Sequence, residues 1–179
     1  EVNMAQTYLQ AYSVQEKLNR MDVDIIDISA TLTGDGTSGD LMFDTTEIAN
    51  CVAINGGTAL LHSVVAIVTN HATDTSGAGS STTGGFKLVI TSDSTSIGTV
   101  SDVIGADTST RAVLDGIATI VGVSDNVDHG YFGVLTKSNI GAVLKAAAGT
   151  KSMYAYGITD STDDYNGATI TLRLGVIKD

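Results

Sequence analysis

Residues 165–179 read Y-N-G-A-T-I-T-L-R-L-G-V-I-K-D, and this stretch decides the fold class. Apolar side chains occupy every second position of it, namely Ala168, Ile170, Leu172, Leu174 and Val176. Alternation with a period of two is typical of a β-strand that buries one face. We therefore expect a strand held in a sheet at this end of the chain, with Arg173 on the outer face of that sheet.

The same period and similar apolar runs recur upstream, between turns rich in Gly, Ser, Asp and Asn. Strands are predicted at 23–32, 40–43, 48–54, 59–69, 86–91, 118–123, 131–136 and 152–158. Eight or nine short strands in this arrangement predict an all-β, jelly-roll-like β-sandwich.

Two of these segments carry further expectations. Ile25 and Ile26 are adjacent and interrupt the alternation of the first strand, which predicts a β-bulge there. Residues 59–69 read A-L-L-H-S-V-V-A-I-V-T and are almost continuously apolar. We expect this segment to be a central strand covered on both faces, in the middle of the sandwich or at a subunit contact.

The chain is expected to hold one domain, residues 23–179, preceded by a different segment, residues 1–22. A chain of 179 residues buries roughly two-thirds of its unfolded surface, which is enough for one core. Residues 5–21 place apolar side chains at spacings of three and four, which indicates either a short amphipathic helix or an extended arm on a neighbouring subunit. Helical turns are also predicted at 108–116 and 137–148, although the second stretch equally fits a loop followed by a strand.

Composition excludes several classes of partner. The formal net charge is -11 and the cations are scattered singly, so we expect no nucleic-acid binding. No apolar run approaches the roughly 20 residues of a membrane span, so we expect no membrane partner. Cys51 is the single cysteine, which excludes an intrachain disulfide and predicts a small buried side chain. These features fit a protein made in a reducing cytoplasm.

Catalytic motifs are not supported by their context. Gly34, Gly36 and Gly39 spell G-x-G-x-x-G, yet the following residues read as a strand, and no helix follows to receive a pyrophosphate. The three histidines, at positions 62, 71 and 129, have no second histidine or cysteine at metal-ligand spacing. His62 lies within the apolar strand, where a core or interface position with a hydrogen-bonded ring is expected. No catalytic residue is assigned, and we expect no enzyme activity.

Carboxylates gather in the turn-rich loops. The loop D-S-T-D-D-Y-N-G offers Asp160, Asp163 and Asp164, and oxygen-rich loops of this kind can hold Ca²⁺. The spacing does not match an EF-hand. We therefore favour a solvated turn for these residues, with a structural calcium site as the alternative, and no other cofactor is indicated.

Several segments together resemble small jelly-roll structural proteins of tailed-bacteriophage virions, of the capsid decoration or cement type. The matching segments are N-C-V-A-I-N-G-G-T-A-L-L-H-S-V-V-A-I, F-K-L-V-I-T, I-G-A-V-L-K-A and the terminal T-I-T-L-R-L-G-V-I-K-D, in this order. The resemblance covers roughly residues 23–179 and consists of strand patterns. It implies a homo-oligomer, often a trimer, located on the capsid surface or elsewhere on the virion.

The leading functional expectation is a capsid decoration or cement protein that binds the major capsid protein and copies of itself. Multivalent burial would then stabilise the icosahedral shell without catalytic residues. Candidate contacts lie in the N-terminal segment: Tyr8, Leu9, Tyr12, Val14 and Leu18. The alternatives are a subunit of a surface filament, which would donate its N-terminal segment as a strand, and a tail-fibre or carbohydrate-binding module.

Overall fold

A computed structural model describes residues 23–32, 35–69, 85–102, 119–123, 125–128, 132–160, 163–164 and 168–178. For residues 35–36, 119–122, 125–128, 132 and 163–164 only the course of the backbone is described. No helix in these ranges is long and apolar enough to cross a membrane. The predicted segments 1–22 and 108–116 lie outside the described residues, so the boundary between an N-terminal segment and the sandwich remains a prediction.

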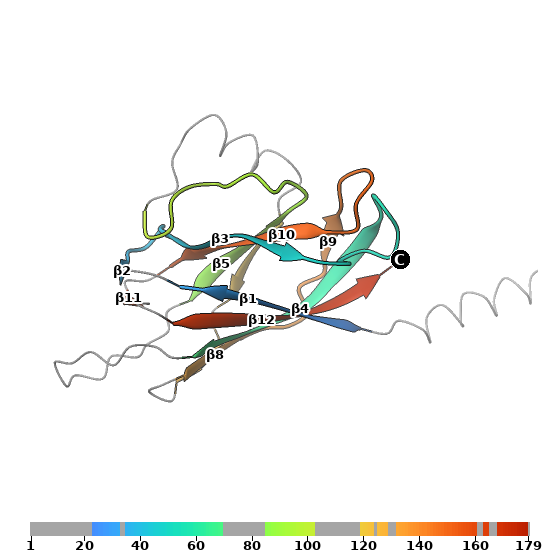
Figure 1. Ribbon diagram of the computed structural model, residues 1–179. Coiled ribbons are helices and arrows are strands. Elements are labelled where there is room, and N and C mark those ends of the chain that lie inside the picture. Colours follow the sequence, from blue (N-terminus) through green and yellow to red (C-terminus); the bar gives the residue numbers. More distant parts are fainter. Residues whose placement is uncertain are drawn as a thin grey trace, which may run out of the picture.

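The described residues form 12 strands. Their bounds are β1 Asp24–Thr31, β2 Asp35–Gly36, β3 Leu41–Ile48, β4 Thr58–Thr69, β5 Phe86–Thr91, β6 Thr119–Val123, β7 Asp125–Asp128, β8 Phe132–Lys137, β9 Ala142–Lys145, β10 Met153–Thr159, β11 Asp163–Asp164 and β12 Thr169–Lys178. Two sheets face one another (Figure 1). The first has six strands in the order β1-β12-β4-β8-β7, with β9 also paired to β4, and the second has four in the order β3-β10-β5-β6.

The pairing of the long strands is that of a jelly roll. When the short strands β2, β7, β9 and β11 are set aside, the first remaining strand pairs with the last (β1 with β12), and the second pairs with the last but one (β3 with β10). The nesting continues inward with β4 paired to β8 and β5 paired to β6, all antiparallel. Such nested pairs wrapped into two sheets are the double Greek key of the jelly roll. The predicted all-β sandwich is therefore confirmed.

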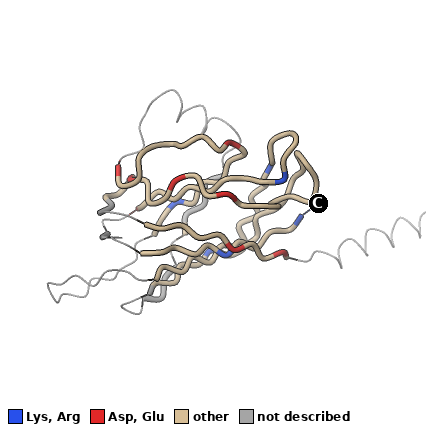
Figure 2. Tube along the Cα trace, in the orientation of Figure 1, with Lys and Arg blue, Asp and Glu red and all other residues tan. Residues whose placement is uncertain are grey.

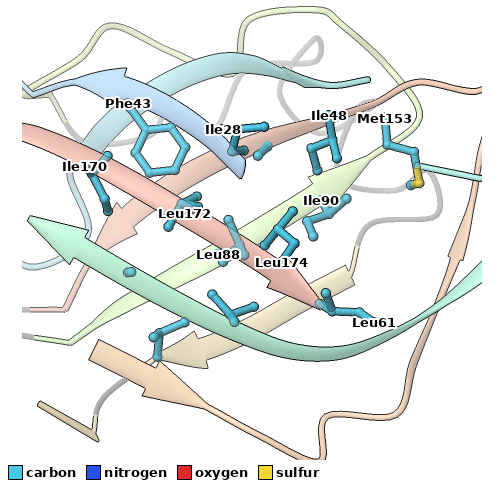
Figure 3. Packing of buried hydrophobic residues seen from close by; sticks show 14 of the residues in the cluster. Ile28, Phe43, Ile48, Leu61, Leu88, Ile90, Met153, Ile170, Leu172 and Leu174 are labelled. Atoms are coloured by element: carbon cyan, nitrogen blue, oxygen red, sulfur yellow. The ribbon is translucent and has the colours of Figure 1, made fainter. Parts of the chain in front are cut away.

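The main core lies between the two sheets (Figure 3). The terminal strand contributes Ile170, Leu172 and Leu174, each with 0% of its surface exposed, and Leu88 and Ile90 of β5 belong to the same cluster. The alternation read from residues 168–176 is confirmed, because the residues between these three are half-buried or exposed. Arg173 lies on the outer face as predicted, with about half of its side chain exposed.

The apolar strand β4 departs from the prediction in one respect. Its buried residues are Ala59 and Leu61, followed by Val64, Ala66 and Val68. The alternation between buried and half-buried positions is therefore interrupted by one extra residue at positions 62–63. The pairing with β12 shows why, since Gly175 lies opposite Ser63 and Val176 opposite Leu61. A β-bulge at this point lets both halves of the strand bury the same face. Strand β4 is central as predicted, between β12 and β8, and its other face is half-buried within the chain itself. The alternative that a subunit contact covers this other face stays a prediction.

The bulge predicted at Ile25–Ile26 is wrong. Strand β1 pairs with β12 without a register shift from Asp24 to Thr31. Ile26 points towards the core and Ile25 points away from it, with 58% of its surface exposed. Two apolar residues are adjacent here because Ile25 lies on the outer face of a regular strand, and the strand holds no extra residue.

Two other segments differ from their predicted structure. Residues 49–57 form turns and bends after β3, because Asn50 and Gly56 adopt positive φ angles of 53° and 66°. The predicted strand 48–54 is thus wrong beyond Ile48. Within 137–148 the alternative of a loop followed by a strand is confirmed, since Asn139 and Gly141, with φ angles of 54° and 68°, end any helical path before β9.

Candidate interaction surface

The two sheets differ in what covers their outer faces. Residues 92–102 pass over the four-stranded sheet and form a second apolar cluster there, made of Leu41, Val89, Ile97 and Tyr156. The Tyr156 hydroxyl fixes this loop, since it lies 2.8 Å from the carbonyl oxygen of Asp93 and 3.0 Å from that of Thr95. Burial raises the pKa of this hydroxyl, which keeps it a donor. No comparable described segment is packed on the outside of the six-stranded sheet.

That uncovered side, called the outer face below, carries an apolar row across three strands. Ile177 of β12 lies opposite Leu60 of β4, which in turn lies opposite Val143 of β9. Leu60 and Ile177 are half-buried and Val143 is 61% exposed. Apolar side chains that gather on one face in this way are typical of a contact surface, whereas isolated ones are normal on any protein.

Elsewhere the outer face mixes apolar side chains, namely the half-buried Val65 and Ile67 of β4 and the exposed Ile25 of β1, with polar groups that pair with one another. Arg173 donates from Nε and Nη2 to the two carboxylate oxygens of Asp27, each at 3.0 Å. The hydrogen bond from Arg173 is the main reason that the pKa of Asp27 is lowered. Ser29 and Thr171 share a hydrogen bond of 3.1 Å on the same pair of strands. Figure 2 shows charged residues of both signs interspersed along the described chain.

Gly175 is closely approached by neighbouring side chains where β12 passes the bulge of β4. A Cβ atom on this residue would lie 2.3 Å from the Ser63 hydroxyl oxygen and 3.0 Å from Cγ1 of Val23. These distances are too short for a side chain to be accommodated without movement. The glycine thus allows Val23 and Ser63 to approach the strand closely.

No match was found to any family model or to any curated protein sequence. A solved structure named Desmodium yellow mottle tymovirus is similar over 86% of this chain and 85% of that chain, with 13% identity and a TM-score of 0.28. A similarity of this degree carries no argument about the present chain.

The histidines and glycines singled out in the sequence do not form a site among the described residues. His62 is half-buried at the bulge of β4, and its carbonyl oxygen accepts the amide of Ile140 at 3.0 Å. His71 and His129 lie outside the described residues. Of the three spaced glycines, Gly36 belongs to β2 and Gly39 to a turn before strand β3, so no helix follows them to bind a dinucleotide.

The predicted calcium loop is only partly described. Asp160 pairs with Lys87 at 2.6 Å, and the backbones of Asp163 and Asp164 pair with β2. Nearby, Asp40 is 5% exposed, and its Oδ2 accepts the amide and hydroxyl of Thr37, while its Oδ1 has no hydrogen-bond partner. No three His, Cys, Asp or Glu residues within the described ranges lie close enough to hold a metal ion.

Cys51 is buried and unpaired by disulfide, as predicted. Burial raises the pKa of its thiol to about 11, so the nucleophilic thiolate is scarce at neutral pH. The structure therefore gives this cysteine a packing role.

The contact residues predicted from the sequence, Tyr8 to Leu18, lie outside the described residues and stay a prediction. The apolar row was not identified from the sequence. Leu60 is hidden within a continuous apolar run, and Ile177 follows directly after the buried Val176. Only the register between β12, β4 and β9 shows that these residues share a face.

Proposed function

We propose that this chain is a non-enzymatic structural protein of a virion, specifically a capsid decoration or cement protein. The observation that carries the proposal is the jelly-roll strand order together with an outer face that bears an apolar row. The jelly roll occurs in viral capsid proteins, lectins and cupins, so the fold is compatible with three classes of protein. Which class applies has to be argued from the site residues.

The described residues favour the structural class over the other two. A cupin holds its metal with clustered side chains, and no such cluster occurs in the described part of the chain. A lectin typically stacks sugars on exposed aromatic rings. Here Phe43, Phe86 and Tyr156 are at most 2% exposed, so these rings are committed to packing.

Shell binding would work through repetition of a modest contact. An apolar row on one sheet face buries a limited area per copy. Many copies bound on one lattice would raise the overall affinity without any additional kind of contact. The partners under this proposal are the major capsid protein and other copies of this chain. The net charge of -11 would keep the exposed side of the coat hydrated and non-adhesive.

A filament subunit that accepts a donated strand is less well supported. Such subunits need a groove in which their own fold lacks a strand. All eight long strands of this jelly roll come from the one chain, and both sheets are continuous. The described sandwich therefore has no missing position for a donor.

The proposal is tested by binding to the shell that the chain would coat. Val143→Lys places a charge in the apolar row, and we expect it to reduce co-sedimentation with undecorated capsids at least about tenfold, because a buried unpaired charge opposes association. Ile54→Lys is the matched control, since Ile54 is 67% exposed but lies in the loop 49–57. Equal binding by both variants and the wild type, or no binding by any of them, would contradict the proposal.

A further inference from the structure

Strand β1 is the edge of the six-stranded sheet, and its outward backbone groups can be identified. Leu32 donates its amide to the carbonyl of Ala168 at 2.8 Å, and these residues lie opposite one another in the continuation of the β1–β12 register. Opposite residues in an antiparallel ladder alternate between bonded and non-bonded pairs. Even-numbered residues of β1 therefore bond to β12. The amides and carbonyls of Ile25, Asp27, Ser29 and Thr31 point away from the sheet.

This edge lacks the features that usually prevent strands from pairing with other chains. Natural edges are protected by bulges, proline, lysine or unpaired charges. Strand β1 runs for eight residues, D-I-I-D-I-S-A-T, without a register shift, and it contains no cation and no proline. Cations of β12 pair with both carboxylates of β1. Arg173 pairs with Asp27, and Lys178 Nζ lies 2.9 Å from Oδ2 of Asp24.

The edge of the other sheet at β3 is different. Leu41 exchanges backbone hydrogen bonds with residues 101 and 102, and the pairing of β3 with β10 contains two register shifts. The amide of Ile97 also approaches Asp44 on this strand at 3.4 Å. Strand β3 is thus irregular and partly covered. Strand β1 is regular and lies beside β3 of the facing sheet, and no described strand pairs with its outward edge.

We propose that β1 pairs with β1 of a second copy, antiparallel and about a two-fold axis at Ile28. This register places Asp27 opposite Ser29 and Ile25 opposite Thr31, so every outward backbone group of β1 is bonded, in about eight hydrogen bonds. A register centred on Asp27 would bring two carboxylates face to face, which is unfavourable. A register centred on Ile26 leaves Thr31 without a partner within β1 of the second copy, and one centred on Ser29 leaves Ile25 without one.

The side chains also match in this register. Ile26 and Ala30 are only partly buried and pack against the rim of the main core. Pairing about Ile28 sets Ile26 of each copy opposite Ala30 of the other, which extends both cores across the interface. The result is one continuous sheet through two sandwiches. This contact goes beyond the proposed binding to a shell and does not depend on it.

Sedimentation velocity of the full chain tests the pairing. We expect the wild type to sediment with about twice the 18.3 kDa chain mass. Ser29→Pro removes an outward amide that β12 does not use, so we expect a folded monomer and at least about tenfold weaker self-association. Ser29→Ala is the matched control, because it also loses the bond to Thr171 but keeps the amide, and it should remain dimeric. A wild-type monomer or trimer, or a dimeric Ser29→Pro, would overturn the proposal.

Cross-linking tests the register independently of the proline variant. In a Cys51→Ala background, Asp27→Cys and Ser29→Cys are prepared separately and then mixed. Opposite Cα atoms in a bonded pair are about 5.5 Å apart, within the range of a disulfide. We expect the mixture to form a disulfide-linked heterodimer that neither variant forms alone. No cross-link in the mixture, or a Ser29→Cys homodimer, would contradict the register centred on Ile28.

Discussion

Replacing Gly157 with alanine tests how strands β10 and β3 pack within the sandwich. A Cβ atom on Gly157 would lie 2.2 Å from Cε1, 2.6 Å from Cδ1 and 2.9 Å from Cζ of the Phe43 ring. The ring would have to retreat by about 1 Å to restore ordinary contact. Phe43 is 2% exposed and belongs to the main core, so its movement displaces other buried side chains.

We expect Gly157→Ala to lower the free energy of unfolding by about 1–3 kcal/mol, the usual cost of overpacking a core. For a chain of this size the melting temperature should fall by about 2–4 °C for each kcal/mol. Urea denaturation followed by circular dichroism measures the loss. In a Phe43→Leu background, which removes the ring, the same substitution should cost less than about 0.5 kcal/mol. A neutral Gly157→Ala in the wild type, or an equal cost in both backgrounds, would show that the new methyl group does not displace the Phe43 ring.

Three other positions and the predicted calcium loop also give testable predictions. The raised pKa of Cys51 means that the native state keeps its proton between pH 9 and 11 while the unfolded chain loses it. The free energy of unfolding of the wild type relative to Cys51→Ala should therefore fall by about 1.4 kcal/mol per pH unit across that window. Denaturation series in which the free energy of unfolding of both proteins changes equally with pH would refute this. Tyr156→Phe should cost about 1 kcal/mol and hasten proteolysis within 92–102, because the hydroxyl that holds this loop is lost; unchanged cleavage would argue against that role. Val143→Lys should leave the melting temperature within about 2 °C, since the side chain is largely exposed, and a larger fall would show that Val143 is needed for folding. A chelator should lower the melting temperature if Asp160 and its neighbours hold calcium, and an unchanged value would exclude that site.

Strands with strict alternation could be predicted because a period of two is the pattern of a strand that buries one face. The terminal strand shows this, since Ile170, Leu172 and Leu174 are all fully buried. The bulge in β4 could not be predicted, because in a continuous apolar run the inward and outward residues are chemically alike. The sequence instead suggested a bulge at Ile25, where an apolar residue faces outward.

The candidate surface could not be predicted from the sequence, for a related reason. Ile177, Leu60 and Val143 come from three distant segments, and only the strand register brings them into one row. The outward backbone groups of β1 likewise depend on which residues bond to β12. Local patterns indicate which side of a strand is buried, but they do not indicate which strands are neighbours or which edge is left open.

Electron cryo-microscopy of the native particle that contains this chain tests the proposed function most directly. Our account predicts copies of the jelly roll repeated on an icosahedral lattice, with the outer face of the six-stranded sheet turned towards the shell or a neighbouring copy. Density for the chain along a filament or at a tail, or an outer face exposed to solvent at every copy, would contradict it.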